Sequence, residues 1–398
     1  MLCHYREMLS GCFLLLFATA TADFNQQFRA GLVALNDNNL VQARQKLESA
    51  SRLQPRNPEV WVALAQTYRR LKSNQLAESA AAKAEQFSAK SPAATHALAI
   101  YYSQADNFEK AANLESRYAA TNDAALADAA VLWFKAGKPQ AAIEYARRAV
   151  AREDRGDLRA LLAESLEADG QFENAESEYQ RAIEKSPYEE QYYFELAQTY
   201  FRHQQFREAV DLLERGTKVF DKSAQLELAL GVGYYGERRF PDATNAFLHT
   251  IEIDPTVSQP YVFLGKMLDQ VGDHIPEVVH RLEGWAAARP NDARALFTYA
   301  RALSITNGDQ AEAEKLLRQS IAMKGDQWES HYELGVLLEK QRKFSEAAAE
   351  LERSIALDGK QADAHYHLAR VYDRLGATDK AAEQRNIHQQ LTASAGIK

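Results

Sequence analysis

Cysteine is almost absent from this chain. Of 398 residues only Cys3 and Cys12 are cysteines, and both lie within the first twelve positions. If that segment is removed, no thiol remains for a disulfide, a nucleophile or a metal site. An exported protein needs paired cysteines or none, so packing alone must then stabilise the fold.

Positive charge and flexible linkers are also scarce. The 47 Lys and Arg residues are outnumbered by 55 Asp and Glu, which gives a net charge of −8. Nucleic-acid binders carry a basic surface, so we expect no nucleic-acid partner. No stretch is rich in Pro, Gly or Ser. Because one core stops growing at about 250–300 residues, the chain must hold several domains or a repeat array.

The longest apolar run is short and lies at the N-terminus. No charge occurs between Met8 and Ala22, and the run ends in Ala20-Thr21-Ala22 before Asp23. A transmembrane helix needs about 20 apolar residues, whereas a short run followed by small-x-small is typical of a secretory signal. We therefore predict a signal peptide over residues 1–22 and a periplasmic or secreted protein.

Two alternatives involve the membrane. Glu7 cancels Arg6 in the segment that a signal peptide usually keeps positive, so an uncleaved N-terminal anchor stays open. The sequence from Leu9 to Cys12 also looks like a bacterial lipobox, whose cysteine becomes lipidated. In that family the apolar run precedes the cysteine, but here it follows. Membrane contact is expected only if the segment is uncleaved or Cys12 is lipidated.

Catalytic motifs are missing as well. The chain has no glycine-rich phosphate loop, no His-Glu-x-x-His and no nucleophile elbow. The tightest histidine pair is His365-x-His367, and on a helix these positions point to different faces. We therefore predict no enzyme, no catalytic residue, no cofactor, no metal site and no small-molecule substrate.

What the sequence does contain is a repeat. Trp61, Tyr193 and His365 each begin a pattern of a large residue, a leucine, a small residue and an aromatic at i, i+3, i+4 and i+7, which is one stripe of a helix. The small residue recurs every 31 to 35 positions, as Gly31, Ala65, Ala99, Ala130, Ala163, Ala197, Gly231, Gly265, Ala300, Gly335 and Ala369. A second series follows each by twelve or thirteen residues, as Ala43, Ala77, Ala111, Ala142, Ala175, Ala209, Ala243, Val278, Ala313, Ala347 and Ala381.

These two series resemble the tetratricopeptide repeat (TPR), a 34-residue helix–turn–helix. The resemblance covers residues 24–391 with about eleven repeats. It implies an all-α, right-handed TPR superhelical solenoid of antiparallel helix pairs, with twenty-two helices. The last helix, Lys380–Leu391, is expected to be a polar cap, and residues 392–398 a flexible tail.

Local features follow from the same pattern. Small residues let two helices approach closely, so both series should lie where the helices of a pair cross. The turns within repeats should be closed by a glycine helix cap at Gly137, Gly170, Gly272, Gly308 and Gly376. Irregularities are expected at three places: a shortened turn between repeats at Tyr118–Ala125, a proline at Gly272–Pro276 and a longer turn at Thr306–Gln310.

The resemblance also implies a binding surface. In this family the first helix of each repeat lines a concave groove, through positions 2, 5, 9, 12 and 13. Aromatic and arginine side chains dominate interface hot spots. Carried over to this sequence, the candidate partner-binding residues are Phe194, Gln198, Phe201, Arg202, Tyr235, Lys266, Phe297, Arg301, Tyr332, Tyr366 and Arg370.

The expected function is protein–protein interaction. We predict a non-enzymatic scaffold of the cell envelope that binds a peptide or protein segment in its groove. The aromatic and cationic groove of repeats six to eleven favours a segment that is apolar with acidic residues. The alternative is a regulatory or assembly subunit of an envelope enzyme or transport complex that docks through its outer faces.

Overall fold

The computed structural model describes residues 22–395 of the chain. In that part the chain forms 22 α-helices and no strand, and 81% of the described residues are helical. The predicted all-α fold of antiparallel helix pairs and the predicted number of helices are confirmed. No helix within residues 22–395 has the length and apolar character needed to span a membrane. The lipobox and all of the predicted signal peptide except its last residue, Ala22, lie outside the described residues.

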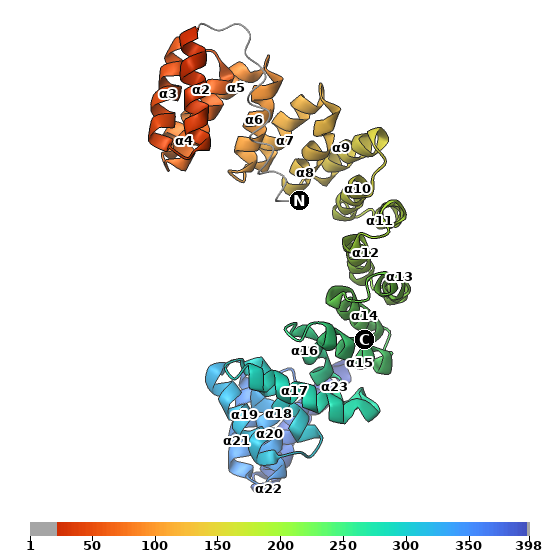
Figure 1. Ribbon diagram of the computed structural model, residues 1–398. Helices are drawn as coiled ribbons and strands as arrows, with labels where there is room; N and C mark the ends of the chain where they lie inside the picture. Colours follow the sequence, from red (N-terminus) through yellow and green to blue (C-terminus); the bar gives the residue numbers. More distant parts are fainter. Residues whose placement is uncertain (1–21, 396–398) are drawn as a thin grey trace. The chain divides into compact units, whose positions relative to one another are not determined.

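The helices fall into two compact units, each a succession of helix pairs (Figure 1). The first unit ends at Tyr192 and contains five pairs. Their bounds are α2 Ala22–Asn36 and α3 Leu40–Leu53, α4 Pro58–Arg70 and α5 Asn74–Ser88, α6 Pro92–Ser103 and α7 Phe108–Ala119, α8 Leu126–Lys135 and α9 Pro139–Arg152, and α10 Gly156–Ala168 and α11 Phe172–Lys185.

The second unit runs from Tyr193 and contains six pairs. Their bounds are α12 Glu190–Arg202 and α13 Phe206–Val219, α14 Ala224–Gly236 and α15 Phe240–Ile253, α16 Gln259–Lys266 and α17 Ile275–Ala288, α18 Ala293–Ile305 and α19 Gln310–Met323, α20 Trp328–Lys340 and α21 Phe344–Leu357, and α22 Ala362–Arg374 and α23 Thr378–Ala395. Within this unit, first helices of successive repeats contact one another directly, as α16 with α18, α18 with α20 and α20 with α22.

Small residues lie where the helices of a pair pack together, as predicted. Every member of both series is buried. A Cβ atom built on Gly231 would lie 2.6 Å from the ring of Phe247, and one built on Gly335 would lie 2.6 Å from Leu351 Cγ. Both neighbours sit one turn after a second-helix alanine. Glycine therefore lets these helices approach more closely than any larger residue would allow.

Each pair turns through one residue with positive φ. Four are the predicted glycines Gly137, Gly170, Gly272 and Gly376. The other seven are Asn38, Lys72, Asp106, Gln204, Arg238, Asn307 and Arg342. The prediction for Gly308 was wrong by one position, because Asn307 takes the left-handed conformation. Gly308 follows it and donates its N–H to the Leu303 carbonyl at 2.8 Å, the second bond of such a cap.

The repeat with a step of 31 differs from the prediction. The connection between α7 and α8 is not shortened: it holds residues 120–125, including a 3₁₀ turn at Asp123–Ala125. The missing residues come from the helices, since α8 has 10 residues where most first helices have 13. The ring of Tyr118 stacks on His96, and its hydroxyl accepts a hydrogen bond from Asn122 at 2.6 Å. These contacts fix the linker and delay the start of α8.

The other two expected irregularities are present. In repeat eight, α16 has only 8 residues and is followed by 3₁₀ turns at Leu268–Gln270 and Gly272–His274. In repeat nine the turn between α18 and α19 holds residues 306–309, one more than the turn at 341–343. The last helix, α23, continues to Ala395, four residues past the end expected at Leu391. It therefore includes the first part of the segment expected to be a flexible tail.

Candidate functional site

All eleven candidate residues lie on first helices of the second unit. They occupy α12, α14, α16, α18, α20 and α22, and we call the exposed surface of these six helices the first-helix face. The exposed candidates are Gln198, Arg202, Lys266, Tyr366 and Arg370. The half-buried candidates are Phe194, Phe201, Tyr235, Phe297, Arg301 and Tyr332.

The half-buried aromatic rings join neighbouring first helices. The Phe201 ring of α12 lies 3.6 Å from where a Cβ on Gly233 of α14 would be. The Tyr235 ring of α14 meets the Phe263 ring of α16 edge-on, with centroids 5.5 Å apart. These rings therefore pack between repeats and remain partly accessible to solvent.

Tyr366 is the most exposed ring among the candidates, with 44% of its surface accessible. The Arg370 guanidinium lies 5.6 Å from its centroid, and the His388 ring lies 5.5 Å from it. Arg370 also pairs with Glu339 of α20 at 3.1 Å, and His367 Nδ1 lies 2.7 Å from the same carboxylate. Two side chains of α22 thus contact the same carboxylate of α20, which holds these two helices of the first-helix face together.

Arg301 makes contacts within the chain that the sequence did not suggest. Its Nε donates to Glu333 Oε1 of α20 at 2.9 Å, and another guanidinium nitrogen donates to the Gly265 carbonyl of α16. Burial raises the pKa of Glu333, and the charge of Arg301 opposes that shift. Arg301 therefore bridges three first helices, with hydrogen bonds to Glu333 and to the Gly265 carbonyl within the chain.

In other repeats too, a basic side chain of one first helix donates a hydrogen bond to a carbonyl at the end of the preceding first helix. The Arg70 guanidinium donates to the Leu35 carbonyl at 2.9 Å, and Lys340 Nζ donates to the Ser304 carbonyl at 3.2 Å. Carbonyls in the last turn of a helix lack helical partners and carry partial negative charge. A basic side chain on the next first helix satisfies them, which the sequence pattern alone did not reveal.

A pocket of about 200 Å³ opens between α16, α18 and α20. It brings together three of the candidate residues, Lys266, Phe297 and Arg301. Arg294 also lines this pocket but was not among the candidate residues. A signal was available, because Arg294 occupies the second position of its repeat, one of the inward positions of the family pattern. Glu333 was missed because nothing in the sequence pairs it with Arg301.

Histidine and acidic side chains form no metal site here. No group of three or more His, Cys, Asp or Glu residues suited to a metal occurs among residues 22–395. His365 Nε2 lies 3.1 Å from the Gly359 carbonyl and Nδ1 lies 2.6 Å from Gln384 Oε1. Trp61 makes the equivalent bond to the carbonyl six residues before it, at 2.8 Å. The side chain at this position closes the linker between repeats.

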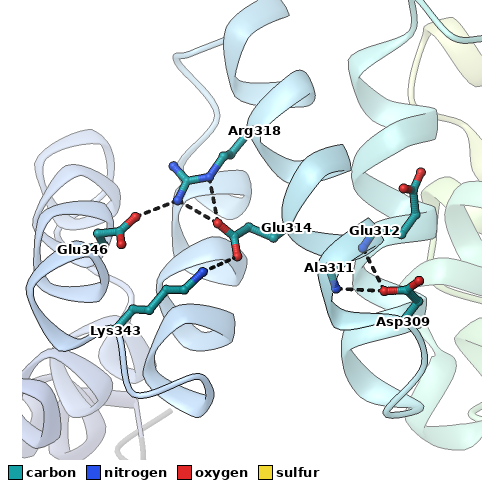
Figure 2. A network of polar contacts seen from close by, with 7 residues as sticks. All are labelled: Asp309, Ala311, Glu312, Glu314, Arg318, Lys343 and Glu346. Carbon is teal, nitrogen blue, oxygen red and sulfur yellow. Dashed lines mark hydrogen bonds and ion pairs between the residues drawn. The ribbon is translucent and has the colours of Figure 1, made fainter.

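The second helices carry charges that pair with each other across repeats (Figure 2). Arg318 of α19 lies 2.9 Å from Glu314 and 2.8 Å from Glu346 of α21. Lys343 reaches Glu314 at 2.9 Å, and this hydrogen bond is the main reason that the pKa of Glu314 is lowered. Asp309 caps α19 by accepting from two backbone N–H groups.

Comparisons with known proteins agree on the repeat. Residues 28–95, 128–190, 305–356 and 332–385 match one tetratricopeptide repeat model, and residues 166–231 match another. No curated protein sequence matches the chain.

Solved structures resemble the chain at low identity. The C-terminal part of a TPR repeat-containing protein from Cytophaga hutchinsonii is 16% identical, covers 68% of this chain and 98% of its own, and has a TM-score of 0.45. The APC/C hetero-tetramer Cut9–Hcn1 is 13% identical over 94% of both chains, with a TM-score of 0.45. Yeast Tom70 is 15% identical over 92% of both chains, with a TM-score of 0.39. These values are too low to support any inference about partners.

The family models match more than half of the sequence, and the chain therefore belongs to the tetratricopeptide repeat family.

Proposed function

We propose that this protein is a non-enzymatic scaffold that binds a segment of another protein along the first-helix face of repeats six to eleven. Tetratricopeptide repeats are protein-interaction modules, which supports the general class of function. The observation that carries the specific proposal is the row of half-buried rings on successive first helices. Rings that are already held by packing lose little conformational freedom on binding, and such residues dominate interface hot spots.

The second helices present charges that are paired between repeats. Several of their exposed charges form ion pairs between repeats, such as Arg318 with Glu346 and Arg281 of α17 with Glu252 of α15. A partner on that side would have to compete with these pairs. The alternative is docking through the outer faces, as a subunit of an envelope complex would do. The experiment must distinguish this alternative from binding on the first-helix face.

The test is affinity capture by the full chain with matched variants. Phe194→Ala with Tyr366→Ala removes two rings from first helices, α12 and α22. Val219→Ala with Met323→Ala removes two exposed apolar side chains from second helices, α13 and α19. We expect the first double variant to lose the captured partner more than tenfold and the second to keep it, with circular dichroism showing that both remain folded. The opposite pattern would favour the outer faces.

We also propose that the chain is exported, because the uncharged segment from Met8 to Ala22 ends in a small-x-small motif. N-terminal sequencing of the mature protein is expected to begin at Asp23 or within about two residues of it. A cytosolic product that retains Met1 would contradict export. A product that begins at a lipidated Cys12 would instead favour the membrane-anchored alternative.

A further inference from the structure

The pocket between α16, α18 and α20 lies beside the irregular part of repeat eight. Helix α16 ends at Lys266 after 8 residues. Just before that end, a Cβ on Gly265 would lie 2.2 Å from Thr298 Cγ2, so α16 and α18 are closely packed there. The Gly265 carbonyl is free to accept the Arg301 hydrogen bond. The close packing of Thr298 on Gly265 and the half-buried pair of Arg301 and Glu333 therefore hold the three helices together at the pocket.

The pocket has more positive than negative charge. Arg301 is balanced by Glu333, which lies behind it at 2.9 Å. Lys266 and Arg294 also line the pocket, both are exposed, and neither forms an ion pair with any residue in the described part of the chain. One acidic side chain, Glu329, also lines the pocket. Lys266 and Arg294, which lie near the ion pair of Arg301 and Glu333, therefore provide a site for a carboxylate.

The rest of the lining is apolar. Phe297 is half-buried and packs against the core of repeats nine to eleven. Val262 of α16 also lines the pocket and is half-buried. Apolar surface beside charge suits a ligand in which a carboxylate and an apolar side chain are neighbours. Arginine binds carboxylates through two parallel hydrogen bonds, which gives Arg294 a specific role.

We propose that this pocket receives an internal Asp or Glu side chain of the bound segment, with an apolar residue beside it. The proposal rests on the function above, since it requires a segment on the first-helix face. Candidate residues also lie on the first helices before and after those that line the pocket, namely Tyr235 on α14 and Tyr366 on α22. A segment that runs past the pocket presents side chains to it, and no chain end is needed.

The test measures binding of synthetic peptides to the full chain by fluorescence anisotropy. The probes are acetylated and amidated twelve-residue peptides that carry one Glu between two Leu residues. Their twins carry Gln at that position, and a third set carries Gln and ends in a free carboxylate. We expect the Glu peptides to bind at least about tenfold more tightly than both other sets, with the preference weakening as salt increases because exposed charges are screened.

The protein variants locate the effect. Lys266→Glu with Arg294→Glu is expected to abolish the preference for Glu. The control, Lys324→Glu with Arg353→Glu, makes the same change of charge at exposed positions outside the pocket and is expected to keep the preference. The proposal is overturned if Gln peptides bind equally, if only a free C-terminus binds, if no peptide binds at millimolar concentration, or if the pocket variant retains the preference. Equal binding of Glu and Gln peptides that is lost in the variant lacking the Phe194 and Tyr366 rings would reject the pocket but keep the proposed function.

Discussion

His96 of α6 lies against a buried carboxylate, with Nδ1 2.9 Å from Oε2 of Glu115 on α7, a residue that is only 1% exposed. Burial alone would lower the pKa of His96, but the hydrogen bond and the charge of Glu115 raise it above 6.5 overall. Burial also raises the pKa of Glu115 above 4.5. The pair thus holds a proton more tightly in the folded chain than in the unfolded one.

This pair predicts that the free energy of unfolding decreases as pH rises. A raised histidine pKa gives stabilisation that is complete below the unfolded value of about 6.5 and is lost as pH rises through the folded value. The raised pKa of Glu115 has the same sign. We expect the guanidinium midpoint of unfolding to be lower at pH 8 than at pH 6, and the decrease to be smaller in His96→Gln. Equal decreases in both proteins would contradict this assignment.

The turns predict a gain in stability from glycine. Lys72 and Arg342 hold φ values of 57° and 62°, a conformation that costs non-glycine residues about 1–2 kcal/mol. Part of the relief is offset by the greater freedom of glycine in the unfolded chain. We expect Lys72→Gly and Arg342→Gly each to gain about 0.5–1 kcal/mol in chemical denaturation. Lys72→Ala is the matched control and should gain nothing, because alanine keeps the strained φ; an equal gain there would exclude this explanation.

Arg301 predicts a loss of stability as well as of binding. In Arg301→Ala the Glu333 carboxylate stays partly buried without its partner, at a cost of about 1–3 kcal/mol. Because solenoid repeats contact only their neighbours, hydrogen exchange should increase mainly in α16, α18 and α20. Adding Glu333→Gln should recover part of the stability. An Arg301→Ala protein that unfolds like the wild type would mean that this ion pair is not structural.

The repeat could be predicted from the sequence because its physical cause is local. A helix pair needs small residues at a fixed spacing to approach closely, so Gly231 and Ala243 mark their repeat without reference to any other part of the chain. The step of 31 could not be interpreted in the same way. Whether a deletion shortens a turn or a helix depends on where a bulky ring such as Tyr118 packs, and that depends on His96, which lies 22 residues earlier in the chain.

The site was predicted less completely for a related reason. The family positions correctly placed Tyr366 and Lys266 on exposed first-helix surface, because exposure follows from helix periodicity. They also selected Arg301, which bonds to a carbonyl 36 residues earlier and to a carboxylate 32 residues later. Such long-range bonds depend on how repeats stack, and no spacing rule in a single repeat contains them.

Site-specific photo-crosslinking tests the central claim most directly. A photoreactive phenylalanine analogue placed at Gln198 or Tyr366 samples exposed first-helix positions, and the same residue at Arg207 or Arg353 samples exposed second-helix positions. The account predicts that illumination in the cell joins one partner protein to the chain at Gln198 and Tyr366 but not at Arg207 or Arg353. Crosslinks confined to Arg207 and Arg353 would show that the partner docks on the second helices, which contradicts the account.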